Sequence, residues 1–268
     1  MGKLKFDSSR LLDVACVLIC LFMLLPVVVV FLSSLDPRKY IRFPPSEFSL
    51  KWYEFFFSRE DWKSAFMNSI YVAALTTLIS TPCGMLAALA YRKYSFKLKG
   101  LFNTLVVVPY LMPSLLIGIT ILMALGRTFL GGTYYIVVGA HCLWATAFVY
   151  MLMQATLANY DLTLEEAAKD LGANPFQTFV EVTLPLLKSG VISAVIFGFI
   201  TSFGEVTMAI FLTTSKTITL PVRIWNSLKY EIHPVTLVAS VICMVFAAIA
   251  LAVVTKLVGI EAVSKIGT

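Results

Sequence analysis

The sequence predicts an all-α membrane protein with six transmembrane helices, and three observations support this prediction. Of the 268 residues, 59% are hydrophobic and only 13% are charged, and the mean hydropathy is +0.87. Soluble domains carry about 25% charged residues, so one soluble globule of this size could not hide so much apolar surface. The apolar residues gather in runs long enough to cross a bilayer, without the alternation typical of β-barrel strands. Because backbone groups must be paired in hydrocarbon, each run is expected to be a helix.

The predicted spans follow these apolar runs in chain order. They cover residues 11–33, 66–91, 101–125, 134–158, 187–213 and 235–258, within a single transmembrane domain of residues 1–268. The first run is longer than the core of a cleaved signal peptide and lacks a small-residue cleavage site, so we expect it to be retained as a helix. An even number of spans places both termini on the same side of the membrane.

The distribution of basic residues predicts which side is cytoplasmic. Lysines and arginines divide almost evenly between the two sides, so their total does not orient the chain. Their density does, because short loops dominate the positive-inside rule. The link 92–100 holds Arg92, Lys93, Lys97 and Lys99, and the N-terminal tail holds Lys3, Lys5 and Arg10. Both segments, and therefore both termini, are predicted to be cytoplasmic. Loop charge of this kind also explains the net charge of +6 without a nucleic-acid partner.

Two links on the opposite side are longer than turns. Residues 34–65 contain the aromatic stretch from Trp52 to Phe57, whose amphipathic rings are expected at the level of the lipid headgroups. Residues 214–234 predict a short surface helix from Leu220 to Tyr230. The five cysteines fall within apolar stretches and are expected to be small buried side chains rather than metal ligands.

The link at residues 159–186 predicts two short helices separated by a glycine. Thr163, with Glu166 three residues later, has the spacing of a capping box that begins the first helix. An apolar face with small residues at its centre follows, made of Leu164, Ala167, Ala168 and Leu171. Gly172 directly afterwards predicts a C-cap.

The second helix of this link has its own start and stop signals. Asn174 predicts the N-cap, Pro175 occupies the first turn, and Leu184 with Pro185 predicts the end of the segment. The apolar and alanine surfaces of both helices need to be covered. They could pack on the chain's own bundle or lie in the headgroup layer, or the small-residue face could let a partner protein approach closely. Periodicity alone leaves these alternatives about even.

This segment resembles the EAA loop of ATP-binding-cassette (ABC) importer permeases. The matching residues are Glu166-Ala167-Ala168, Gly172, Leu184 and Pro185, with Val182 where the family pattern usually has isoleucine. The resemblance implies a type I ABC importer permease of the MetI-like fold. It also implies that residues 159–186 are cytoplasmic and that this loop is the coupling helix, which docks into a groove on the ATPase. Leu164, Leu171 and Pro175 are expected to take part in the same contact.

Other stretches resemble the spermidine/putrescine-type group of these permeases. They are residues 48–53, 204–221 and 224–234. The resemblance implies a second, homologous permease forming a heterodimer, an ATPase dimer that uses ATP and magnesium, and an external or periplasmic substrate-binding protein. It implies an inner-membrane location and no cofactor bound by this chain. The implied solute is a polyamine or related amino compound, while an organophosphonate, an opine or an amino acid are alternatives within the same architecture.

Glu205 is the main candidate for the solute pathway, together with Ser202 and Phe203. It lies within the predicted fifth span, where a charge in lipid costs from about 2.5 kcal/mol upward, so it should face a cavity or a partner. A carboxylate lining the pathway would attract a cationic solute. The alternative is a structural role, with a backbone amide or a nearby hydroxyl such as Ser202 or Thr207 as the partner.

Two further features of the spans are weighed in the same way. Pro109 and Pro113 bracket Tyr110 in the predicted third span, where a break in the helix could form part of a gate or be only a kink. Tyr110 and Pro113 are therefore further candidates for the solute pathway. His141 in the predicted fourth span is expected to be neutral and hydrogen-bonded to a neighbouring helix.

Motifs that would indicate another class of protein are missing from the sequence. There is no His-Glu-x-x-His, no Gly-x-Ser-x-Gly and no phosphate-binding Gly-x-x-x-x-Gly-Lys-Ser/Thr loop. The chain is therefore expected to be a transport subunit and not an enzyme, with ATP hydrolysis on a separate polypeptide. A self-sufficient secondary transporter is the less favoured alternative, because no internal repeat is evident.

Overall fold

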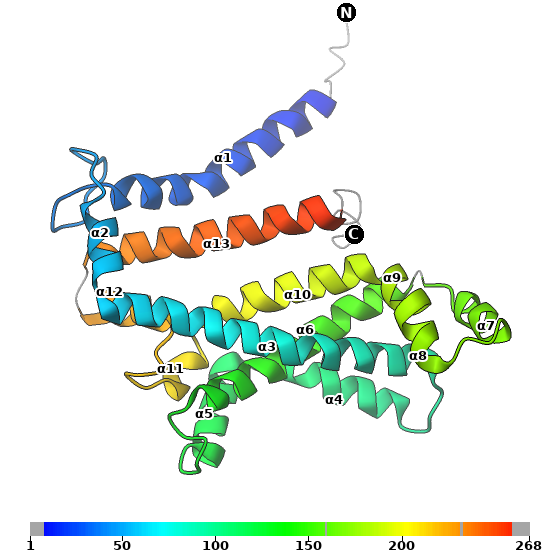
Figure 1. Cartoon of the computed structure of the whole chain (residues 1–268). Helices are drawn as coiled ribbons and strands as arrows, with labels where there is room; N and C mark the ends of the chain where they lie inside the picture. Colours follow the sequence, from blue (N-terminus) through cyan, green and yellow to red (C-terminus); the bar gives the residue numbers. More distant parts are fainter. Residues whose placement is uncertain (1–7, 159, 231–232, 259–268) are drawn as a thin grey trace, which may run out of the picture. The chain divides into compact units, whose positions relative to one another are not determined.

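The computed structural model describes residues 8–158, 160–230 and 233–258, and every regular element in these residues is helical (Figure 1). Two compact units are present. The first comprises Met1–Lys63 and Asn226–Met244, and the second comprises Ser64–Trp225 and Val245–Thr268. The predicted placement of the termini, with Lys3, Lys5 and Asn159, lies outside the described residues.

The first unit contains α1 (Ser8–Ser34), α2 (Lys51–Ser58), and parts of α3, α12 and α13. Trp52 and Phe56 lie four residues apart on one face of α2, and both are buried. The ring of Trp52 meets the ring of His233 edge-on, with 4.9 Å between the centroids. Of the rings predicted at the level of the headgroups, these two pack inside the unit, whereas Phe57 is exposed. Their depth in the membrane stays a prediction.

The second unit is built around α6 (Tyr134–Ala158), which packs against α4 (Lys99–Leu111) and α10 (Lys188–Phe203). The long helix α3 (Glu60–Lys93) also approaches α6 closely, because a Cβ at Gly84 would lie 2.7 Å from the side chain of Val149. A core of buried side chains joins these helices, including Tyr150, Met153 and Leu187. Such close approach through small residues is typical of helices packed within a membrane.

Several short helices lie at the two ends of this unit (Figure 1). At one end are α5 (Ser114–Leu125) and α11 (Ala209–Leu212), which pack together. At the other end are α7 (Thr163–Asp170), α8 (Pro175–Gln177), the π-helix η1 (Thr178–Thr183) and α9 (Leu184–Leu186). The helix α12 (Leu220–Tyr230) has the bounds predicted for a short surface helix, and α13 is Val235–Val258.

The described residues contain four helices long and apolar enough to cross a membrane, namely Leu12–Ser34, Glu60–Lys93, Tyr134–Ala158 and Val235–Val253. There are up to six crossings if each of two bent helix pairs is one span. These pairs are Lys99–Leu111 with Ser114–Leu125, bent by 99°, and Pro175–Leu186 with Lys188–Phe203, bent by 75°. The sequence predicted helices at both places. It indicated a possible break near Pro113, but not the bend between Leu186 and Lys188.

Two predicted spans differ from the structure for identifiable reasons. The span 101–125 is not one straight helix, because Pro113 has no N–H and forces Met112 into an extended conformation with ψ 140°. The span 187–213 is helical only to Phe203, where Gly204 ends α10, and α11 begins after a short break. The helix α6 has the predicted bounds.

The predicted burial of the cysteines is also wrong in part. Cys16, Cys20 and Cys83 are exposed, and only Cys142 and Cys243 are half-buried. All three exposed thiols lie on apolar helices that could cross a membrane, so lipid can surround them.

Candidate functional site

The segment Thr163–Leu186 folds as two helical pieces joined by a sharp turn, and we call it the elbow. Its first helix does not begin as predicted. The backbone of Leu162 is already helical, so the hydroxyl of Thr163 is not in the N-cap position, and the capping box with Glu166 is absent. Instead the backbone N–H of Thr163 donates to the carboxylate of Asp161 at 2.9 Å. This backbone hydrogen bond lowers the pKa of Asp161.

The turn of the elbow depends on Gly172, as predicted. Its φ is +92°, in the region that favours glycine. The N–H of Gly172 donates to the carbonyl of Lys169 at 2.9 Å, and the N–H of Ala173 donates to the carbonyl of Ala168 at 3.0 Å. Together they form a Schellman motif. A Cβ at Gly172 would meet nothing within 4 Å, so the position needs glycine for its backbone conformation and not for space.

The second piece of the elbow also starts as predicted. Asn174 and Gln177 form a reciprocal capping box, with both hydrogen bonds at 2.9 Å, and Pro175 occupies the first turn. The helix then widens into the π-turn Thr178–Thr183, just before the proline at position 185, which has no N–H to donate. The helix continues one residue past Pro185 and bends at Leu187.

The residues predicted to contact the ATPase lie mostly on the surface of the elbow. Leu171 is 90% exposed and the nearby Phe176 is 74% exposed. Between the two helical pieces is a hollow of 330 Å³, which is lined by Ala168, Leu171, Gly172, Ala173, Gln177, Glu181 and Val182. The other predicted residues divide into the exposed Leu164, Glu166, Ala167, Pro175 and Pro185 and the half-buried Leu184. The described chain therefore leaves much of the apolar surface of the elbow uncovered.

Glu165 is the one buried residue of α7, with 4% of its surface exposed, and no pattern in the sequence predicted this. Its carboxylate lies 2.6 Å from the ammonium of Lys93 and accepts hydrogen bonds from Tyr160 at 2.7 Å and Thr183 at 2.8 Å. Burial opposes ionisation of this carboxyl, but the hydrogen bonds from Lys93, Tyr160 and Thr183 outweigh it and lower the pKa of Glu165. Burial also raises the pKa of Tyr160 to about 12.

The predicted pathway residue Glu205 lies in the break between α10 and α11. Its carboxylate accepts hydrogen bonds from the backbone N–H groups of Met208, at 2.9 and 3.0 Å, and Ala209, at 3.1 Å. One carboxylate oxygen is also 3.4 Å from Nε2 of His141, without hydrogen-bond alignment. The other ring nitrogen of His141 lies 2.8 Å from the hydroxyl of Ser202 on α10, so the predicted hydrogen bond to a neighbouring helix is present. These bonds give Glu205 the backbone partners considered in the structural alternative.

The other predicted pathway residues do not join this cluster. The ring of Phe203 stacks on that of Phe246, with 5.4 Å between the centroids. Tyr110 stacks on Trp144 with centroids 4.9 Å apart, and Pro113 is the N-cap residue of α5. The structure therefore brings Ser202 and Glu205 together around His141, and leaves Phe203, Tyr110 and Pro113 in separate surroundings.

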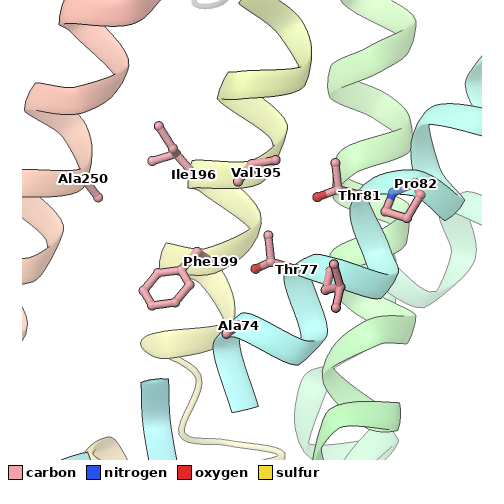
Figure 2. A pocket seen from close by; sticks show the side chains of 9 residues that line it. Ala74, Thr77, Thr81, Pro82, Val195, Ile196, Phe199 and Ala250 are labelled. Atoms are coloured by element: carbon pink, nitrogen blue, oxygen red, sulfur yellow. The ribbon is translucent and has the colours of Figure 1, made fainter. Parts of the chain in front are cut away.

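A larger hollow of 550 Å³ lies among α3, α10 and α13 (Figure 2). Its lining is apolar except for two threonines, and comprises Ala74, Thr77, Leu78, Thr81, Pro82, Val195, Ile196, Phe199 and Ala250. None of the predicted pathway residues lines it. Within the described residues, no group of three or more histidine, cysteine, aspartate or glutamate side chains could hold a metal ion.

Comparison with known proteins connects this geometry to a family. A family profile described as "Binding-protein-dependent transport system inner membrane component" matches residues 80–259. The putative 2-aminoethylphosphonate transport system permease protein PhnV of Salmonella paratyphi A is 32% identical over 215 residues, which are 80% of this chain and 80% of that protein. The spermidine/putrescine transport system permease protein PotC of Escherichia coli K12 is 23% identical over 214 residues, again 80% of each chain.

Solved structures agree at the level of the fold. A chain of a bacterial ABC transporter involved in the import of the acidic polysaccharide alginate superposes with a TM-score of 0.74 at 15% identity, covering 94% of this chain and 97% of that one. A chain of the MetNI methionine ABC transporter, in an inward-facing conformation, gives a TM-score of 0.60 at 17% identity, covering 77% and 96%. At these identities the likeness concerns the fold alone.

Proposed function

The chain belongs to the family of binding-protein-dependent transport system inner-membrane components and is an ABC importer permease; from this premise we propose that it forms half of the pathway for a small solute that carries an ammonium group. In this proposal the chain does not hydrolyse ATP. A separate ATPase dimer supplies the energy, a second, homologous permease completes the pathway, and an external binding protein delivers the solute.

The observation that carries the proposal is the uncovered elbow. Leu171 and Phe176 project from a link between helices and are 90% and 74% exposed, next to a hollow of 330 Å³. Apolar side chains grouped in this way are stabilised when another protein covers them. The EAA pattern of the elbow resembles the loop that docks on the ATPase in related permeases, which supports the ATPase as the covering protein.

The elbow has the mechanical properties that such a contact requires. The Schellman turn at Gly172 and the capping box of Asn174 set the angle between its two pieces by hydrogen bonds of 2.9 to 3.0 Å. A displacement of one piece of the elbow is therefore expected to move the other piece with it. We expect closure of the ATPase dimer to displace the elbows of both permeases and to switch the pathway between inward- and outward-facing states.

The solute class rests on the relatives and not on a binding site. One relative is named for 2-aminoethylphosphonate and another for spermidine and putrescine, and each of these solutes bears an ammonium group at neutral pH. Glu205 is the candidate anion for such a group. Its side chain is 10% exposed, and its present partners are backbone amides and His141, so contact with a solute would use only part of the carboxylate.

Reconstitution in liposomes tests the proposal. The chain is co-purified with the second permease and the ATPase encoded beside it, and uptake of radiolabelled 2-aminoethylphosphonate and putrescine is measured with the binding protein outside the vesicles. We expect uptake of one of the two that requires ATP and the binding protein. Uptake by the purified chain alone would instead support a self-sufficient secondary transporter. Cross-linking from a cysteine at Leu171 to the ATPase checks the elbow contact without any solute.

A further inference from the structure

The carboxylate of Glu165 joins three segments that are separate in the sequence. Lys93, 2.6 Å away, is the last residue of α3. Tyr160, whose hydroxyl donates at 2.7 Å, follows the end of α6, and Thr183, which donates at 2.8 Å, lies in the second piece of the elbow. Glu165 itself belongs to the first piece. We call these four residues the Glu165 junction.

The junction is buried, so the carboxylate of Glu165 depends on these partners for its stability. Glu165, Tyr160 and Thr183 are 4%, 7% and 0% exposed, and the side chain of Lys93 is 24% exposed. A carboxylate removed from water in this way is stable only with its partners in place, and removal of one partner leaves an uncompensated charge. The hydrogen bonds from Lys93, Tyr160 and Thr183 also hold the pKa of Glu165 below its ordinary value, so the carboxyl is ionised at neutral pH.

The position of Lys93 gives the junction a mechanical consequence. The elbow is joined by the chain itself to α6 at one end and to α10 at the other, so these helices follow its movement through covalent bonds. The helix α3 does not adjoin the elbow in the sequence. The contact between Lys93 and Glu165 connects α3 to it directly, at a position where the same carboxylate also holds both pieces of the elbow together.

We propose that Glu165 and Lys93 are positioning residues that make the end of α3 move with the elbow when the ATPase acts on it. This inference rests on the proposed function, since it requires an ATPase that displaces the elbow. The alternative is that the junction only stabilises the folded chain. The two alternatives predict different effects when the bond to α3 is removed while the other two hydrogen bonds of Glu165 remain. The proposal predicts that α3 no longer moves with the elbow, and the alternative predicts only a loss of stability.

The test uses the assembled complex of both permeases and the ATPase, with the native cysteines replaced. Spin labels are placed at the exposed positions 169, in the elbow but outside the apolar residues assigned to the ATPase contact, and 97, in the link that follows α3. The distance between them is measured by electron paramagnetic resonance without nucleotide and after trapping with ATP and vanadate. We compare the unaltered junction with Lys93→Met, and use Tyr160→Phe as the matched control, because it removes a bond to the same carboxylate without touching α3.

With the junction intact, and in Tyr160→Phe, we expect the distance to change by less than about 2 Å on trapping, as for segments that move together. In Lys93→Met we expect a larger change, and the exchange Lys93→Glu with Glu165→Lys should restore the smaller one. Solute moved per ATP hydrolysed, with 2-aminoethylphosphonate as the probe, should fall about 5-fold or more in Lys93→Met, the lower end of typical coupling between sites.

Two results would overturn the inference, and they are distinguishable. If Lys93→Met leaves the distance change as small as in the unaltered complex, or if Lys93→Met and Tyr160→Phe enlarge it equally, the junction is only structural and the proposed function is untouched. If no complex forms and a cysteine at position 171 never cross-links to the ATPase, the proposed function fails and the inference fails with it.

Discussion

Replacement of Gly172 tests most directly whether the shape of the elbow is set by backbone conformation. An L-residue in the left-handed region costs roughly 1–2 kcal/mol, and the φ of Gly172 is +92°. Alanine also reduces the entropy of the unfolded chain, which is worth about 0.4–1 kcal/mol in the opposite direction. The net expectation for Gly172→Ala is a loss of about 1 kcal/mol in the local stability of the elbow, or about fivefold in an opening equilibrium.

Amide hydrogen exchange measures this loss at the bonds concerned. The N–H of Ala173, which donates to the carbonyl of Ala168 at 3.0 Å, should exchange about fivefold faster in Gly172→Ala than in the unaltered chain. Gly172→Asn should be affected less, because asparagine tolerates the left-handed region better than alanine. In the assembled transporter, Gly172→Ala should also lower solute uptake per ATP.

Gly139 provides the matched control for this experiment. A Cβ at either glycine would meet nothing within 4 Å, but only Gly172 of the two has a positive φ. Gly139→Ala in α6 should therefore leave the elbow unchanged and stabilise its own helix slightly. If Gly172→Ala protected the amide of Ala173 as well as glycine does, the turn would not depend on the left-handed conformation, and the argument for a fixed elbow angle would be refuted.

Three further predictions concern the surface, the pathway and the pH dependence. Leu171→Ser should leave the thermal stability of the chain unchanged but reduce co-purification of the ATPase, whereas Phe129→Ser, at an equally exposed position at 89%, should not. If the carboxylate contacts the cation, Glu205→Gln should reduce uptake of putrescine without lowering the thermal unfolding midpoint. A reduced uptake accompanied by a lower midpoint would leave Glu205 a structural residue. Because the folded-state pKa of Glu165 is lowered, its contribution to stability is present above the unfolded pKa and is lost as the pH falls through the folded one. The difference in unfolding midpoint between the unaltered chain and Glu165→Gln should therefore shrink from pH 7 to pH 4, and a constant difference would contradict the ionised assignment.

The parts of the fold that the sequence predicted well are those set by local chemistry. The helix α6 is a long apolar run, and α12 starts at a leucine-proline pair, so composition and start signals were enough for their bounds. Gly172 and Asn174 were assigned correctly as caps for the same reason, because each acts on bonds within a few residues. Where a second candidate lay close by, local reasoning was insufficient: Asp161, and not Thr163, accepts the first N–H of α7.

The parts that were missed depend on contacts between distant segments. Glu165 differs little from Glu166 in sequence, and only the folded chain shows that one is buried against Lys93 while the other is exposed. The predicted fifth span continued past Phe203 because residues 206–212 are mostly apolar. Hydropathy cannot show that Gly204 ends the helix and that Glu205 binds the amides of the next one. The candidate site was therefore predicted as a segment, while its internal connections were not.

The helix α10 connects the two places where these unpredicted contacts occur. It begins at the bend after the elbow, and it ends where Ser202 meets His141 and Glu205 closes the break to α11. Near its start, a Cβ at Gly190 would lie 2.5 Å from the side chain of Thr156, so α10 and α6 touch closely there as well. A helix held on α6 at both ends cannot bend freely between them, because packed interiors deform little. If the ATPase displaces the elbow as proposed, we therefore expect the displacement to reach the Glu205 cluster as a movement of α10 along α6, with the hydrogen bond between His141 and Ser202 opposing it.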